Sequence, residues 1–151
     1  MVSTKDELTR CCKDLAGSTF LAVDTEFLRE KTYFPKLALI QVANESSTYV
    51  IDPLAIGQLD DFFQLINDPA ITKVLHSARQ DYEIFFHLQG KLPAPIFDTQ
   101  VAASLLGYGE QIGYANLVKN LLDIEVDKSQ TRTDWTRRPL NNKQLAYAAS
   151  D

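Results

Sequence analysis

The order of strand-like and helix-like segments limits the folds open to this chain. Three strand-like runs follow one another, and two more alternate with helical segments. These runs cover residues 20–24, 37–43, 48–51, 71–75 and 96–97. Only the polar residues 44–47 separate the second run from the third, which favours an antiparallel hairpin. The order predicts an α/β fold in which helices pack on a mixed β-sheet.

Apolar spacing and end signals mark the helical segments. Ser3 is a candidate N-cap of the first helix, with Asp6 in the capping-box position and Gly17 just beyond the helix end. Gly90 ends a later helix in the same way. The other helices are expected at residues 58–66, 79–88, 99–106, 114–122 and 142–151. The last of them has no stop signal, so we expect the sequence to be a fragment that ends inside this helix.

Length and composition exclude several classes of protein. With 151 residues, 45% of them hydrophobic and 23% charged, the chain is expected to be one globular domain. It has no run of about 18 apolar residues for a membrane span, and its N-terminus is polar. Adjacent Cys11 and Cys12 rarely reach disulfide geometry with each other, so they are expected to pack the first helix. We therefore expect a reducing, cytoplasmic setting, no membrane partner and a monomer.

Charge is distributed unevenly along the chain, whose net charge is −5. Residues 1–127 carry ten lysines and arginines against eighteen acids, whereas residues 128–143 carry five against one. The basic segment also holds Trp135, and cations with an aromatic ring are typical of segments that bind a single nucleic-acid strand. An anionic partner is one interpretation of this segment, and a solvated loop is the other.

Asp24 and Glu26 lie two residues apart at the end of the first predicted strand. Alternate residues of a strand point to the same face, so the two carboxylates would repel each other unless a cation lies between them. Hard oxygen ligands of this kind suit Mg²⁺ or Mn²⁺. The alternative is a pair of acids at the solvated end of a strand, because this spacing is common.

Two further acids carry weaker signals. Asp81 falls in the first turn of a helix that follows a strand, where an acid also favours the helix dipole. Tyr147 and Asp151 are four positions apart on the last predicted helix and so share one face. A half-buried tyrosine beside a surface acid is the structural interpretation of that pair. Taken singly, neither feature identifies a site.

Taken together, these residues follow an order typical of nucleases. An Asp-x-Glu pair on a first strand, an aspartate after a later strand and Tyr-x-x-x-Asp on a late helix resemble the motifs of the DEDD superfamily of 3′–5′ exonucleases, in its tyrosine branch. The surrounding segments are similar to the bacterial ribonuclease D family. They are AVDTEF at 22–27, LIQV at 39–42, HSARQD at 76–81, FDTQ at 97–100, DW at 134–135, RPL at 138–140 and YAA at 147–149. The resemblance extends from Phe20 to Asp151.

The resemblance implies a ribonuclease H-like fold, with helices on both faces of the sheet, that removes nucleotides from RNA 3′ ends, tRNA precursors included. It also implies two divalent ions, Mg²⁺ or Mn²⁺, held by Asp24, Glu26, Asp81 and Asp151. Tyr147 would orient the attacking water, with partial base character. Residues 1–151 would form the exonuclease domain, without the helical HRDC domains that the family carries after it. An acid at the last position would be poorly held, which predicts weak metal binding and low activity.

Substrate contacts are expected in two places. Thr25, Phe27 and Leu28 lie beside the metal pair, where Phe27 and Leu28 would stack on the terminal base; simple packing is the alternative. The second place is the basic segment, whose candidate residues are Lys128, Arg132, Trp135 and Arg138. Structural roles are expected for His76, as a core hydrogen-bonding group, and for Asp98, as an N-cap.

Two other functions stay open on the sequence alone. A DNA 3′–5′ exonuclease would use the same chemistry, because no residue is identified as a reader of the ribose 2′-hydroxyl. A non-catalytic module that binds nucleic acid or protein on the same fold is the other. Such modules usually lose one or more of the motif acids, and all four are present here, which favours an enzyme.

Overall fold

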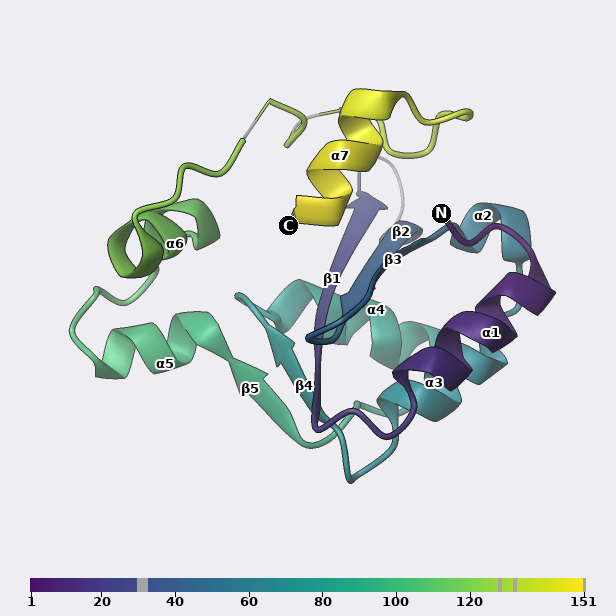
Figure 1. Cartoon of the computed structure of the whole chain (residues 1–151), viewed down its shortest axis with the longest axis horizontal. Helices are drawn as coiled ribbons and strands as arrows, with labels where there is room; N and C mark the ends of the chain where they lie inside the picture. Colours follow the sequence, from purple (N-terminus) through teal and green to yellow (C-terminus); the bar gives the residue numbers. More distant parts are fainter. Residues whose placement is uncertain (30–32, 128, 132, 151) are drawn as a thin grey trace.

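The computed structural model describes residues 1–29, 33–127, 129–131 and 133–150. Within these residues, five strands form one sheet in the order β3-β2-β1-β4-β5 (Figure 1). The strands are β1 (Phe20–Leu28), β2 (Lys36–Ala43), β3 (Thr48–Ile51), β4 (Thr72–Leu75) and β5 (Ile96–Asp98). β2 is antiparallel to both β1 and β3, whereas β4 and β5 run parallel to β1. The sheet is therefore mixed, as the sequence predicts.

Helices lie on both faces of the sheet (Figure 1). They are α1 (Lys5–Leu15), α2 (Pro53–Ile56), α3 (Asp60–Ile66), α4 (Arg79–Gln89), α5 (Thr99–Leu105), α6 (Tyr114–Leu122) and α7 (Asn142–Ser150). α1, α3 and α4 share the main core with β1 and β2, which includes Phe62, Phe85 and the unbridged Cys11 and Cys12. α7 packs on the other face, where Tyr147 joins a second, smaller core. In the described part of the chain, no helix combines the length and apolar character needed to cross a membrane.

The first helix starts one residue later than predicted. Its N-cap is Thr4, whose hydroxyl accepts a hydrogen bond from the Glu7 backbone N–H at 3.3 Å. The Glu7 carboxylate in turn accepts from the backbone N–H of Thr4 at 3.0 Å, which completes a capping box. The predicted pair of Ser3 and Asp6 is wrong, because the same motif forms one position further on. Gly17, with a φ of +83°, follows the helix end as predicted.

Two differences from the predicted boundaries affect the site. β1 continues to Leu28 because its pairing with β2 persists, so Asp24 and Glu26 lie inside a strand and not at its end. The short helix α2 is absent from the sequence prediction. Asp52 caps α2 by accepting from two backbone N–H groups, and Pro53 occupies its first turn. An aspartate directly before a proline was the available signal for this helix.

Candidate active site

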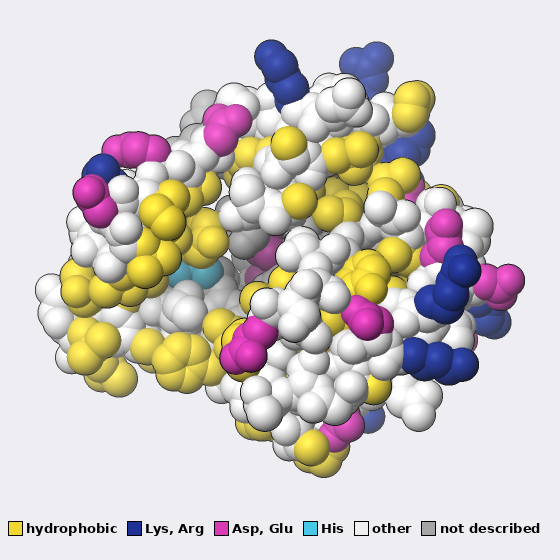
Figure 2. Space-filling model, viewed as in Figure 1, with side chains coloured by type: hydrophobic (Ala, Val, Ile, Leu, Met, Phe, Trp, Pro, Cys, Tyr) yellow, Lys and Arg dark blue, Asp and Glu magenta, His cyan; other side chains and the backbone are white. Residues whose placement is uncertain are grey.

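A cleft of about 460 Å³ opens on the face of the sheet that α7 covers. It lies between α7 and the segment that carries α5 and α6, and Figure 2 shows a hollow there with a histidine in its wall and acidic side chains inside. Asp24 of β1, Gln41 of β2, His76 after β4 and Tyr147 of α7 line it. The cleft therefore brings together two residues that the sequence predicts as catalytic.

Asp24 and Glu26 lie on the cleft face of β1. Their neighbours Val23 and Thr25 are buried toward the other face, while both acids are half-buried. In the register of β1 and β2, Asp24 stands directly opposite Gln41. The two carboxylates thus share one face, as strand alternation predicts.

Asp81 occupies the first turn of α4 and is 6% exposed. The Thr25 hydroxyl donates a hydrogen bond to its carboxylate. Burial raises the pKa of Asp81 to about 6, although this hydrogen bond opposes the shift, and nearby Asp98 adds to it. Asp81 thus contacts β1 at Thr25, which lies between Asp24 and Glu26 in sequence. The Thr25 side chain, however, points to the face of the strand opposite the two acids.

The chemistry of these acids fits a divalent cation, although the described residues do not form a complete metal site. Carboxylate oxygens are the ligands that Mg²⁺ and Mn²⁺ prefer, and a bound cation would offset the burial of the Asp81 carboxylate. Among the described residues, no three Asp, Glu, His or Cys side chains come together as metal ligands. The fourth predicted ligand, Asp151, lies outside the described residues.

Tyr147 is positioned by the residues that precede it. The Asn141 side chain accepts from the Gln144 backbone N–H at 2.9 Å, and the Gln144 side chain accepts from the Asn141 backbone N–H at 3.0 Å. This reciprocal pair fixes the first turn of α7. The Tyr147 hydroxyl oxygen lies 3.2 Å from that of Thr131, and its ring centroid lies 5.8 Å from that of Trp135. The tyrosine is therefore held at the cleft wall by the loop before α7.

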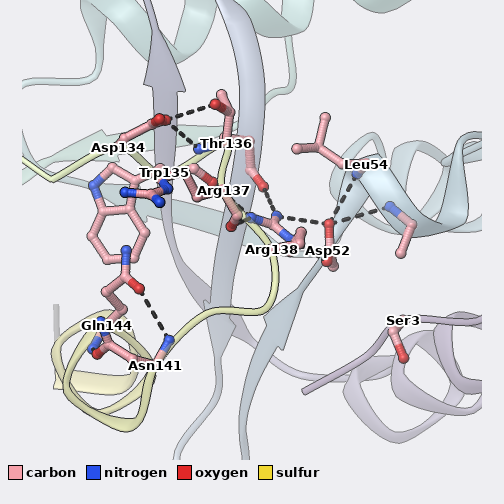
Figure 3. Close-up of polar contacts among 12 residues, drawn as sticks. Ser3, Asp52, Leu54, Asp134, Trp135, Thr136, Arg137, Arg138, Asn141 and Gln144 are labelled. Atoms are coloured by element: carbon pink, nitrogen blue, oxygen red, sulfur yellow. Dashed lines mark hydrogen bonds and ion pairs between the residues drawn. The ribbon is translucent and has the colours of Figure 1, made fainter.

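Arg138 fastens this loop to the sheet (Figure 3). Its guanidinium donates to the two Asp52 carboxylate oxygens at 2.6 and 2.8 Å. Further bonds of 2.8 and 2.7 Å go to the backbone carbonyls of Ala38 and Trp135. Ala38 falls at a register shift between β1 and β2, where the strand ladder is interrupted. Burial alone would raise the pKa of Asp52, but the hydrogen bonds and charge of Arg138, together with two backbone N–H groups of α2, outweigh it and hold that pKa below its usual value.

In the structure, Trp135 and Arg138 of the basic segment make contacts within the fold. Trp135 is 4% exposed and belongs to the second core, so its ring packs inside the fold. The Arg138 guanidinium is occupied by Asp52 and by backbone carbonyls. Trp135 is therefore packed rather than solvated, whereas Arg138 stays exposed while its guanidinium binds Asp52, and contact of either residue with nucleic acid stays a prediction. Lys128 and Arg132 lie outside the described residues.

The substrate contacts predicted on β1 divide between the two faces. Thr25 is buried and donates to Asp81, which removes it from the cleft. Phe27 is half-buried and packs against the main core, as the packing alternative predicts. Leu28 is half-buried at the end of β1, and its contact with a substrate stays a prediction.

The predicted N-cap role of Asp98 is confirmed, and His76 forms hydrogen bonds as predicted, although it lies half-buried at the cleft wall and not in a core. The His76 ring nitrogens lie 2.9 Å from the Thr99 hydroxyl oxygen and 2.9 Å from the Ile112 carbonyl oxygen. Asp98 caps α5, and its carboxylate also accepts from two backbone N–H groups ahead of α4. His76 therefore holds one wall of the cleft in place.

Sequence reasoning missed two residues of this region, Gln41 and Asp52. A single amide within the apolar run 37–43 was a visible signal for Gln41, since a polar side chain inside a buried strand needs a partner. The ion pair of Asp52 with Arg138 had no comparable local signal. It joins residues that the sequence places far apart.

Comparison with known proteins first concerns the sequence. Residues 1–151 match a family model described as 3′–5′ exonuclease. A ribonuclease D of Gluconacetobacter diazotrophicus is 47% identical over 152 residues, which cover 100% of this chain and 39% of that protein. The chain thus spans about two fifths of the length of the curated relatives that it matches.

Solved structures show the same architecture. The crystal structure of Escherichia coli RNase D, described as an exoribonuclease involved in structured RNA processing, has a TM-score of 0.96 and 40% identity, covering 100% of this chain and 40% of that one. Brucella melitensis NrnC bound to pGG has a TM-score of 0.80 and 30% identity, covering 91% of this chain and 68% of that one. Another structure of NrnC carries bound Mg²⁺. These similarities confirm the predicted fold class.

Proposed function

This chain belongs to the 3′–5′ exonuclease family, and we propose that it forms the nuclease domain of a ribonuclease D-like enzyme that hydrolyses RNA from its 3′ end. The observation that carries the proposal is the cleft on one face of the sheet that both Asp24 and Tyr147 line. RNA is favoured over DNA because the relatives with 100% coverage of this chain are ribonucleases. Precursors of tRNA are the substrate class that we propose, in a cytoplasmic setting.

Phosphodiester hydrolysis needs an activated water and a neutralised phosphate. Divalent cations supply both when they are bound. Asp24 and Glu26 offer their carboxylates on the cleft face, and Asp81 and Asp151 are the other two proposed ligands. Mg²⁺ is our first choice because NrnC binds it, with Mn²⁺ as the second and two ions as the proposed number.

Tyr147 is proposed to orient the attacking water. Its hydroxyl is placed at the cleft wall by Thr131 and by the packing of its ring near Trp135. A free tyrosine has a pKa of about 10, so at neutral pH orientation contributes more than proton removal.

The proposal is tested with an RNA oligonucleotide labelled at its 5′ end and incubated with the chain and Mg²⁺, Mn²⁺ or EDTA. We expect stepwise shortening from the 3′ end with either metal and none with EDTA. A DNA of the same sequence is the matched substrate. Faster shortening of the DNA would favour the DNA exonuclease, and binding of RNA without shortening in any condition would favour a non-catalytic module.

A further inference from the structure

Gln41 is a buried amide in the wall of the cleft. The residue is 4% exposed, and neither Nε2 nor Oε1 has a hydrogen-bond partner among the described residues. It stands opposite Asp24 in the register of β1 and β2. Buried polar groups are normally paired, because they give up hydrogen bonds to water when the chain folds. An unpaired amide at this place therefore needs an explanation.

Gln144 shows how the same side chain is used when its role is structural. It is 5% exposed, close to the value for Gln41. Its Oε1 accepts from the Asn141 backbone N–H at 3.0 Å, and its Nε2 donates to the Thr133 hydroxyl at 3.3 Å. Gln41 is equally buried but keeps both atoms unused beside a cleft. This difference points to a ligand as the missing partner.

The two unpaired atoms select the chemistry of that ligand. Nε2 donates and Oε1 accepts, so a full partner must do both. Phosphate oxygens only accept and would leave Oε1 unpaired. A hydroxyl group donates and accepts, and the 2′,3′-diol of a terminal ribose presents two neighbouring hydroxyls. Opposite residues of paired strands have Cβ atoms about 5 Å apart, so the side chains of Gln41 and Asp24 leave the sheet at neighbouring positions on the same face.

We infer that Gln41 binds the 2′,3′-diol of the terminal ribose and makes the site prefer RNA ends to DNA ends. The inference rests on the proposed function, which brings the RNA 3′ end into this cleft. Deoxyribose lacks the 2′-hydroxyl and would leave one of the two buried amide atoms unpaired. Gln41 would then be the reader of ribose that sequence reasoning did not identify.

The test compares two oligoribonucleotides that differ only in their last nucleotide, which is ribose or 2′-deoxyribose. We expect the wild-type chain to remove the ribose-ended nucleotide about tenfold faster, the effect of one hydrogen bond. Gln41→Met removes the amide at similar length and should bring this ratio close to one. An unchanged ratio would overturn the inference. So would an effect confined to ends that carry adenine, because the amide would then contact a base edge.

A binding measurement separates this inference from the proposed function. Adenosine 5′-monophosphate and its 2′-deoxy analogue are titrated into both proteins with Mg²⁺ and followed by NMR. Tighter binding of the ribonucleotide by the wild-type chain, but not by Gln41→Met, supports the inference even if no RNA is hydrolysed. Equal binding of both nucleotides by the wild-type chain overturns it. Urea unfolding adds a check: Gln41→Met should be no less stable, and a clear loss would indicate a structural role instead.

Discussion

Two buried polar side chains, one on each face of the sheet, differ in whether the fold supplies their hydrogen-bond partners. On the face covered by α1, α3 and α4, the Lys73 ammonium donates to three backbone carbonyls at distances of 2.6 to 2.9 Å. On the cleft face, the Gln41 amide has no partner among the described residues, and Asp24 and Glu26 bring two like charges onto one strand. Lys73 thus finds its partners within the fold, whereas Gln41 is the residue for which we propose a ligand.

A change of charge on the cleft face should have the largest effect. Asp24→Asn is expected to slow RNA shortening about a thousandfold, because loss of a metal ligand removes several kcal/mol of transition-state stabilisation. The free energy of unfolding should hold or rise, since repulsion of Glu26 is relieved. Asp60→Asn, which changes an exposed acid on α3, is the control for both measurements. Normal turnover by Asp24→Asn would remove Asp24 from the metal site.

Substitutions on the face covered by α1, α3 and α4 should change the free energy of unfolding. Phe85→Ala empties a position on α4 that is 1% exposed, and we expect it to lower the free energy of unfolding by about 4 kcal/mol. Phe86 is the next residue on the same helix and is 57% exposed, so Phe86→Ala should cost about 0.5 kcal/mol or less. Urea unfolding of both variants makes the comparison. Similar losses would mean that burial does not distinguish the two positions.

Tyr147→Phe tests positioning on the cleft face. We expect kcat for RNA shortening to fall about a hundredfold, because the attacking water loses the hydroxyl that orients it. KM should change little. Tyr49→Phe is the matched control, since the Tyr49 hydroxyl donates to Asp14 at 2.8 Å outside the cleft. Equal slowing of both variants would argue against a specific role for Tyr147.

A substitution in the loop before α7 should have a smaller effect, on the free energy of unfolding. Arg138→Met leaves the Asp52 carboxylate without its cation, and we expect a loss of about 2 kcal/mol of unfolding free energy. Arg137→Met alters an exposed neighbour and should be nearly silent. Urea unfolding of both variants measures the difference. If the two variants behave alike, the Arg138 bonds contribute nothing that solvent does not replace.

Local signals were enough for much of the fold. The hairpin of β2 and β3 and the bounds of α6 follow from apolar runs interrupted by polar residues, and both agree with the structure. The predicted start of the first helix was one residue too early, because Ser3 and Thr4 offer the same capping chemistry. Local sequence does not distinguish such equivalent neighbours. Strand alternation likewise predicted that Asp24 and Glu26 share a face.

Long-range contacts account for what sequence reasoning missed. The sequence of the basic segment does not indicate whether its cations bind RNA or a buried carboxylate. Only the fold brings Arg138 to Asp52, and only the second core buries Trp135. The absent partner of Gln41 is also a property of the folded chain, since Gln144 is about equally buried and finds partners nearby.

The smallest expected effect is the pH dependence that Asp52 contributes. Burial would raise the pKa of Asp52, but the Arg138 guanidinium and two backbone N–H groups outweigh it and lower that pKa. An unfolded aspartate has a pKa of about 3.9, so this stabilisation is complete above that value and is lost as pH falls through the lower, folded value. Asp52→Asn should therefore lose less stability than the wild-type chain between about pH 6 and about pH 3. Urea unfolding at the two pH values measures it.

Arg138→Met separates the two sources of the Asp52 shift. If the guanidinium lowers this pKa more than the N–H groups of α2 do, the variant should lose stability less steeply than the wild-type chain as the pH falls. A pH dependence as steep as that of the wild-type chain would assign the shift to the cap of α2 alone. In that case acid would weaken α2 without loosening the loop before α7. The position of Tyr147 at the cleft would then depend on the backbone bonds of Arg138 rather than on its ion pair.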